Sequence, residues 1–352
     1  MTASDIDIKY MNRCLQLASV GAGQVSPNPL VGAVLVCDDK IIGEGYHQKY
    51  GKPHAEPNAI NAVVDKKLLK KATLYVNLEP CAHHGKTPPC ANLIVECGIP
   101  KVVIGSLDPN PKVSGRGAEI LKNAGIEVKV GILEDKCLEL NKRFFTFQTQ
   151  KRPYVILKWA QTQDGFIDRN RKDSSETPLL ISNAETRILT HKTRSENQSI
   201  LIGANTAVMD NPSLTVRFWS GKNPIRLVID PQGRVPANHN VKNGQIETII
   251  FTEKKLENSL NLRFINIDFS KHSLKNLLAA IYNENIHSVL VEGGAQVLTN
   301  FLKEGCWDEA QVEISPQRIG DGVKAPTISI QPISRKTIEG HDCLLFKNEY
   351  LI

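Results

Sequence analysis

The sequence predicts a two-domain protein in which both domains belong to the α/β class. Helix and strand patterns alternate in both halves, and 352 residues are more than one ordinary compact core accommodates. A polar and basic stretch with three phenylalanines, residues 141–152, separates the halves and is followed by Pro153 and an apolar strand. We therefore place the boundary near residue 150, with domains at 1–147 and 148–352.

The first half reads as an α/β sandwich. An amphipathic helix at 5–18 precedes a hairpin of two strands, 30–36 and 40–44, that turns at Asp38-Asp39. The further elements expected are strands at 73–77, 101–106 and 127–131 and helices at 55–64, 89–97 and 118–123. Gly98 and Gly125 are placed to end the last two helices.

The second half repeats the alternation of strands and helices. The strands expected lie at 154–157, 199–202, 225–229, 248–251 and 288–291, and the helices at 184–193, 274–283 and 296–302. No internal repeat or low-complexity tract interrupts the pattern.

Composition favours a cytoplasmic protein without membrane or nucleic-acid partners. No stretch approaches eighteen apolar residues, and residues 1–7 carry two aspartates and no basic region. The eight cysteines lack the spacing of a disulfide framework. The net charge of +6 is scattered, with one dense group at residues 66–71. Such a balance suits anionic small molecules, for example a sugar phosphate or a phosphorylated dinucleotide.

Four residues of the first half have the pattern of a catalytic zinc site. His54, Cys81 and Cys90 supply three ligands, and catalytic zinc has three protein ligands and an open position for water. Glu56 lies close enough to reach that water without binding the metal, and could carry its protons to departing ammonia. A histidine, a non-ligand glutamate and a proline-cysteine form the signature of the zinc nucleobase deaminases. The other cysteines are interpreted as packing residues: Cys14, Cys37, Cys97, Cys137, Cys306 and Cys343.

The loop between the cysteines points to one branch of these deaminases. Eight residues separate Cys81 from Cys90, where the general pattern has two. The run from Glu79 to Cys90, with Ser26 to Gly32, Gly45 to Glu56 and Asp108 to Gly117, resembles the deaminase domain of the bifunctional riboflavin-biosynthesis deaminase-reductases. The resemblance implies a cytidine-deaminase-like α/β/α sandwich. It also implies a substrate-binding set: Asn28, His47, Lys86, Thr87 and Asp108. His83 and His84 could contact substrate or be mistaken for a fourth ligand.

A glycine turn marks a candidate site in the second half. Glu292-Gly293-Gly294 joins a strand to a helix, which can bring backbone N–H groups up to a phosphate, although such a turn can equally be structural. Lys158-Trp159-Ala160, Gly203 to Thr206 and Asp210 to Arg217 accompany it, and together they resemble the reductase domain of the same family. That domain has a dihydrofolate-reductase-like fold.

The resemblance implies the ligands of this second domain. NADPH would be bound by Thr206, Asp210 and the Gly293-Gly294 turn, with Gln161 near the nicotinamide. Substrate would be held by Arg194, Leu214, Arg217 and Glu292, and the arginines would meet its 5′-phosphate. Arg194 alone could equally be an ordinary exposed helix residue. The chain departs from the family at Thr162-Gln163, at Asn211 and in segment 176–180, which lacks the usual serine and tryptophan.

The sequence therefore predicts two consecutive steps of riboflavin biosynthesis. Zinc-dependent deamination of 2,5-diamino-6-(5-phosphoribosylamino)pyrimidin-4-one would precede NADPH-dependent reduction of the ribosyl to the ribityl side chain. We expect a homo-oligomer, either a dimer or a tetramer. Three alternatives stay open: a nucleic-acid-editing deaminase with an accessory domain, a non-catalytic protein stapled by zinc, and an active deaminase with an inactive reductase.

Overall fold

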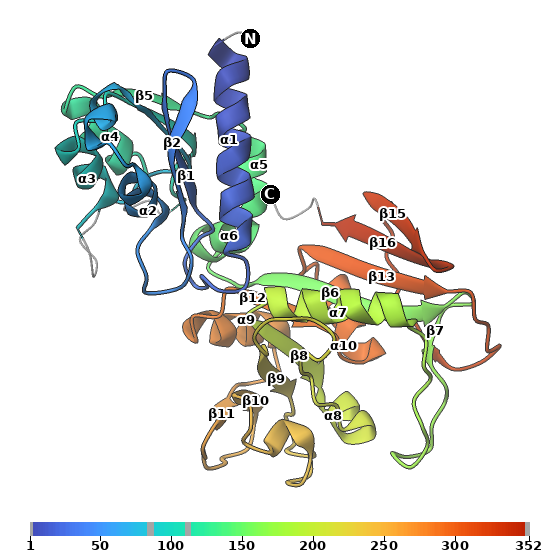
Figure 1. The fold of residues 1–352 in the computed structure, drawn as a ribbon. Helices are drawn as coiled ribbons and strands as arrows, with labels where there is room; N and C mark the ends of the chain where they lie inside the picture. Colours follow the sequence, from blue (N-terminus) through green and yellow to red (C-terminus); the bar gives the residue numbers. More distant parts are fainter. Residues whose placement is uncertain (1–2, 83–87, 110–113, 349–352) are drawn as a thin grey trace. The chain divides into compact units, whose positions relative to one another are not determined.

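The chain divides into two compact units between Lys151 and Arg152. The computed structural model describes residues 3–82, 88–109 and 114–348 (Figure 1). The basic, phenylalanine-containing stretch between the domains forms a helix, α6 (Lys142–Gln150), and Thr146 and Phe147 lie on its buried side. The predicted boundary at residues 147 and 148 therefore falls inside α6.

Unit 1 contains a five-stranded sheet with strand order β2-β1-β3-β4-β5. Its strands are β1 (Gly32–Cys37), β2 (Lys40–Tyr46), β3 (Thr73–Leu78), β4 (Lys101–Ser106) and β5 (Glu127–Val130). Its other helices are α1 (Ala3–Val20), α2 (Ala55–Ala62), α3 (Cys90–Glu96), α4 (Arg116–Asn123) and α5 (Glu134–Leu140), with a 3₁₀ turn at Lys66–Lys71. β1 pairs antiparallel with β2 and β3, whereas β3, β4 and β5 run parallel. The predicted hairpin and strands of this half are confirmed.

The sheet of unit 1 is covered on both faces. Alternate residues of a strand point to opposite faces. Ala33 and Leu35 of β1 therefore pack with α2, α3 and α4, whereas Val34 and Val36 pack with α1 and α5. The unit is thus the predicted α/β/α sandwich.

Helix ends position the candidate zinc ligands. His54 is the N-cap of α2, directly before the helix predicted from residue 55, and Cys90 is the first residue of α3, one residue after the start predicted at 89. Gly98 and Gly125 follow the ends of α3 and α4 with φ of 65° and 81°, a region that glycine adopts without strain. α2 and α3 lie on the same face of the sheet, so their first residues converge.

Unit 2 contains a nine-stranded sheet with the order β11-β10-β9-β8-β12-β6-β13-β16-β15. Its strands are β6 (Tyr154–Thr162), β8 (Ser199–Gly203), β9 (Ile225–Ile229), β10 (Thr248–Thr252), β11 (Leu262–Asn266), β12 (Ser288–Val291), β13 (Glu309–Ser315), β15 (Ser334–Ile338) and β16 (His341–Lys347). A separate two-stranded sheet is formed by β7 (Phe166–Asp168) and β14 (Val323–Lys324). Only β16 and β15 add antiparallel pairs to the large sheet as the structure describes it.

The helices of unit 2 are α7 (Ala184–Glu196), α8 (Ala204–Asp210), α9 (Ser273–Asn283) and α10 (Ala295–Lys303), with a 3₁₀ turn at Asn240–Lys242. All strands and helices predicted for this half are confirmed, but β6 extends to Thr162, and α8, β7, β11 and the strands from β13 onward were not predicted. α9 and α10 pack on one face of the sheet through Leu277, Leu298 and Phe301. Among the described residues, no helix is long and apolar enough to cross a membrane.

Candidate active sites

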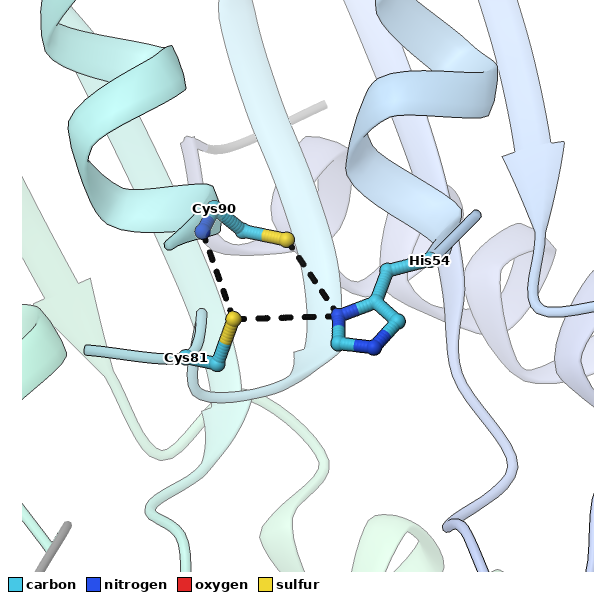
Figure 2. Close-up of side chains that lie close together, drawn as sticks. All are labelled: His54, Cys81 and Cys90. Atoms are coloured by element: carbon cyan, nitrogen blue, oxygen red, sulfur yellow. Dashed lines mark hydrogen bonds between the residues drawn. The ribbon is translucent and has the colours of Figure 1, made fainter. Parts of the chain in front are cut away.

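His54, Cys81 and Cys90 lie together at the ends of two helices and a loop (Figure 2). Their ligand atoms all lie within 4.8 Å of one another. His54 Nδ1 is 3.7 Å from the Cys81 sulfur and 3.4 Å from the Cys90 sulfur. The backbone N–H of Cys90 donates to the Cys81 sulfur at 3.3 Å, which fixes the loop that carries it.

These distances fit a tetrahedral zinc ion. Zinc bonds of about 2.3 Å to sulfur and about 2.0 Å to nitrogen place tetrahedral ligands roughly 3.5–3.8 Å apart. The hydrogen bonds from Cys90 and His54 lower the pKa of Cys81 against the opposing effect of burial, whereas the pKa of Cys90 is raised, chiefly through its hydrogen bond with Cys81. One thiolate is therefore favoured beside His54 before a cation adds its own charge. A set of one nitrogen and two sulfurs leaves one tetrahedral position for water.

Glu56 is buried beside this cluster and is 3% exposed. Burial, followed by the charge of Cys81, raises the pKa of Glu56 to about 7. Its Oε2 atom has no hydrogen-bond partner among the described residues. A carboxyl group with a pKa near neutrality and a free oxygen can both accept and return a proton.

The cluster opens into a cavity of about 300 Å³ that also contains three of the predicted substrate residues. Asn28 and His47 contact each other, with 3.1 Å between Asn28 Nδ2 and His47 Nε2, and His47 Nδ1 lies 3.0 Å from the Pro53 carbonyl oxygen. Asp108 lines the same cavity. Lys86 and Thr87, with His83 and His84, lie outside the described residues.

Glu79 lines this cavity and was quoted in the sequence motif without a role. Its buried carboxylate accepts backbone N–H groups from Asp108 at 3.0 Å, Gly115 at 2.9 Å and Ala118 at 3.0 Å. A side chain on Gly117 would collide with the Pro80 carbonyl oxygen, 2.1 Å from an added Cβ. Glu79 therefore holds the backbone that carries Asp108 against the zinc-site loop.

Helix α6 adds residues that sequence reasoning missed. Phe144 and Gln148 line the cavity from this helix. Asn141, just before it, accepts the Leu30 N–H at 2.8 Å and donates to the Leu30 carbonyl oxygen at 2.9 Å. The alternation of phenylalanines with polar residues was the available signal, because at helical spacing it gives α6 one apolar face.

The second candidate site is a cavity of about 490 Å³ in unit 2. It brings together six of the nine residues predicted for cofactor and substrate: Thr206, Asp210, Gly294, Arg194, Arg217 and Glu292. The other three are Gln161, Leu214 and Gly293, and none of them lines the cavity as the structure describes it.

The three carboxylates that line this cavity as the structure describes it, Asp168, Asp210 and Glu292, all have arginine partners. Arg194 and Glu292 form a two-pronged ion pair with distances of 2.8 and 2.6 Å. Asp210 pairs with Arg171, whose Nε donates to Asp168 at 2.7 Å. Arg194 is therefore not the ordinary exposed helix residue that was left open, and Arg171 is a cavity residue that the sequence analysis missed.

The three residues outside the cavity have structural contacts. Gln161 accepts a hydrogen bond from the Trp159 indole at 2.8 Å. The Leu214 side chain is 4% exposed and packs in the core at a φ of 55°, so only its backbone could meet a ligand. A Cβ at position 293 would lie 2.4 Å from the Ile202 Cα. Close packing against β8 therefore explains why this position is a glycine.

The departures from the family pattern have local explanations in two places. Asn211 ends α8 at a φ of 41°, a left-handed conformation that asparagine tolerates, and its side chain accepts the Asn240 N–H at 2.7 Å. Thr162 donates to Asp164 at 2.6 Å, and Asp164 also accepts the N–H groups of Ile319 and Gly320. Segment 178–182 lines the cavity with mainly apolar side chains.

Comparisons with known proteins identify both units. Residues 153–346 match the family model of the RibD C-terminal domain, and residues 4–106 match the cytidine and deoxycytidylate deaminase zinc-binding region. The riboflavin biosynthesis protein RibD of Aquifex aeolicus is 43% identical, with 98% of this chain and 99% of that protein aligned. The chain belongs to the RibD family. The family protein of Escherichia coli is 36% identical over 90% of each chain.

The family's solved structures agree with this assignment. A deaminase and reductase from Thermotoga maritima superposes with a TM-score of 0.87 at 38% identity, covering 98% of this chain and 99% of that one. That protein is a diaminohydroxyphosphoribosylaminopyrimidine deaminase and 5-amino-6-(5-phosphoribosylamino)uracil reductase. The predicted family and fold class, a cytidine-deaminase-like domain followed by a reductase domain, are confirmed, as is a zinc-binding deaminase domain.

Proposed function

We propose that this chain catalyses two consecutive steps of riboflavin biosynthesis, as a bifunctional deaminase and reductase. The first removes the 2-amino group of 2,5-diamino-6-(5-phosphoribosylamino)pyrimidin-4-one to give 5-amino-6-(5-phosphoribosylamino)uracil. The second uses NADPH to reduce the ribosyl to the ribityl side chain. The observation that carries the proposal is the convergence of three zinc-ligand atoms beside the buried carboxyl group of Glu56, in a chain of the RibD family.

The residues of unit 1 have separate roles in deamination. His54, Cys81 and Cys90 would hold zinc, which when bound lowers the pKa of a water molecule towards neutrality. Glu56 takes a proton from the attacking water and delivers it to the leaving ammonia, which its raised pKa allows. Asn28, His47 and Asp108 line the cavity beside it and bind the substrate, together with Thr87.

The residues of unit 2 position cofactor and substrate. Thr206, Asp210 and the turn at Gly294 bind NADPH, and Arg194, Arg217 and Glu292 bind substrate. Gln161, Gly293 and Leu214, set back from the cavity, would contribute through the backbone they hold in place. Because hydride moves from the cofactor, the protein has mainly to align the two reactants and exclude water.

We also propose that the enzyme acts in the cytoplasm as a homo-oligomer, a dimer or a tetramer. The small-molecule substrate and the absence of a membrane-spanning helix among the described residues support the location. Light scattering of the purified chain would give its oligomeric state.

The experiment that tests the function follows both steps in one vessel. The purified chain with zinc is given the diaminopyrimidine ribosyl phosphate, and ammonia release is measured before NADPH is added. Ammonia followed by loss of the NADPH absorbance supports both activities. Ammonia release without NADPH consumption would support the deaminase activity and reject the proposed reductase activity. No ammonia release would reject the proposed deaminase activity and favour the nucleic-acid-editing alternative.

A further inference from the structure

One wall of the unit 2 cavity is formed by basic residues of a single helix. Arg187, His191 and Arg194 of α7 all line the cavity, at spacings of four and three residues that place them on one helix face. Arg217 reaches the same wall from the segment after α8. His191 was not among the residues predicted from the sequence.

The charges on this wall are unequally compensated. Glu292 neutralises Arg194. The Arg187 guanidinium lies over the Phe218 ring, 4.7 Å from its centroid. No hydrogen bond or ion pair of the Arg217 guanidinium occurs within the part of the chain that the structure describes. The wall therefore keeps a net positive charge that suits an anion.

The geometry of His191 fixes which of its ring nitrogens carries the proton. The ring is 4% exposed, and its Nδ1 accepts the backbone N–H of Arg217 at 2.9 Å. A nitrogen that accepts a hydrogen bond carries no proton, so in the neutral ring the proton is on Nε2. Within residues 3–82, 88–109 and 114–348, Nε2 forms no hydrogen bond. The Phe218 ring, edge-on at 4.8 Å, holds the imidazole in this orientation.

The ring stays neutral at physiological pH. Burial, followed by the charges of Arg194 and Arg217, lowers the pKa of His191 to about 4. Glu292 faces the ring with the opposite effect, and Arg187 adds to the lowering. His191 is thus a fixed N–H donor rather than a fourth cation.

We propose that His191 donates its Nε2 proton to a phosphate monoester bound beside Arg217, while its Nδ1 holds the Arg217 backbone in place. The proposal rests on the proposed reductase function and adds a binding residue to it. Arg217 supplies charge and His191 supplies a directed hydrogen bond, so the pair would favour phosphorylated over dephosphorylated ligand. Two ligands carry such a group: the substrate, at its 5′-phosphate, and NADPH, at its 2′-phosphate.

Two substitutions separate the two nitrogens of the ring. In His191→Asn the side-chain oxygen can take the place of Nδ1, so the Arg217 contact is kept and the Nε2 donor is lost. In His191→Gln the amide nitrogen reaches the place of Nε2, so the donor is kept and the Nδ1 acceptor is lost. His287→Gln is the matched control, because His287 is a buried histidine of the same unit, 6% exposed, that does not line the cavity.

Reductase kinetics give the decisive measurement. For His191→Asn we expect KM for the phosphorylated ribosyl substrate to rise about tenfold, the cost of one hydrogen bond to a charged group, with kcat nearly unchanged. The dephosphorylated substrate should show a much smaller change, and His191→Gln should stay closer to wild type. A rise in KM for NADPH instead, absent with NADH, would assign the phosphate to the cofactor. Unchanged KM for both ligands, or a larger loss in His191→Gln than in His191→Asn, would overturn the proposal.

A binding measurement keeps this test independent of turnover. Ribose 5-phosphate binding to the full chain, followed by calorimetry with ribose as control, should weaken about tenfold at one site in His191→Asn and not in His287→Gln. If the wild-type chain consumed no NADPH, the proposed reductase function would fail while this measurement still decided the phosphate site. Equal ribose 5-phosphate affinity in wild type and His191→Asn, together with an unchanged KM for NADPH, would reject the site.

Discussion

The guanidinium of Arg194 and the carboxylate of Glu292 form a two-pronged ion pair in the lining of the unit 2 cavity, with side chains 13% and 11% exposed. Burial alone would raise the pKa of Glu292, but the attraction and hydrogen bonds of Arg194 outweigh it, and the pKa is lowered. Both residues were predicted to hold substrate. In the structure the charge of each side chain is compensated by the other, so a ligand phosphate that bound Arg194 would share its guanidinium with Glu292.

Removing one partner of this pair should destabilise unit 2. Glu292→Gln leaves a buried guanidinium without its counter-charge, and we expect the free energy of unfolding to fall by about 3 kcal/mol. Urea unfolding of the full chain, followed by a probe in unit 2, measures it. Arg335→Gln, in an exposed pair with Asp342, should cost less than about 1 kcal/mol. Equal losses in the two variants would contradict this account.

Glu56→Gln should abolish deamination without removing zinc. The amide cannot accept and return a proton, so we expect kcat for ammonia release to fall by about 10²–10⁴-fold. Zinc content, measured by atomic absorption, should stay at the wild-type value because Glu56 is not a ligand. NADPH consumption with the deaminated substrate should also stay unchanged. Loss of zinc, or normal turnover, would remove Glu56 from the proposed role.

Glu79→Gln tests the carboxylate that holds the Asp108 backbone. In the wild type, three backbone N–H groups donate to the carboxylate oxygens of Glu79. In Glu79→Gln, an amide NH₂ group replaces one of these oxygens and cannot accept a hydrogen bond from them. We expect KM for the deaminase substrate to rise about tenfold through a displaced Asp108, with zinc retained. Glu119→Gln, on the exposed side of α4, is the control. If kcat fell and KM did not, Glu79 would act on the zinc site rather than on substrate binding.

Local motifs explain why the zinc cluster was predictable. His54 and Glu56 lie at the start of one helix, and Cys81 and Cys90 flank one loop. Their spacing along the chain is therefore enough to predict that they form one site. Arg171 and Asp210 pair across 39 residues with no such spacing. Their contact depends on how the loop before α7 packs against α8, which no local pattern reports.

Buried polar groups explain why β13 was missed. Glu313 interrupts the apolar alternation of this strand, yet it is 4% exposed. Its carboxylate accepts hydrogen bonds from Ser182 and Thr186 and lies 2.8 Å from His341 Nδ1. These partners come from distant segments, so a strand that looks half-polar in the sequence lies inside the sheet.

Removing zinc should separate the two activities. Among the described residues, His54, Cys81 and Cys90 form the one group of three that could hold a metal ion, and it lies in unit 1. A chelator should therefore stop ammonia release and leave NADPH consumption with the deaminated substrate intact. Cys90→Ser should bind less zinc and lose deamination, whereas Cys97→Ser, outside the cluster, should behave as wild type. Loss of both activities on chelation would place a second metal requirement in unit 2.

Acid should destabilise unit 2 through its buried histidines. Burial lowers the pKa of His287 to about 4, from an ordinary value near 6.5. Between these values the unfolded chain binds a proton that the folded chain does not, so the free energy of unfolding falls as pH drops from about 6.5 to about 4. The full difference is about 3 kcal/mol for this one group. His287→Gln keeps an N–H donor for Asn285, 3.3 Å from Nε2, but cannot titrate. Urea unfolding at pH 7.5, 6 and 5 should show a shallower loss of stability in His287→Gln than in wild type, and parallel pH profiles would show that His287 does not titrate as its burial requires.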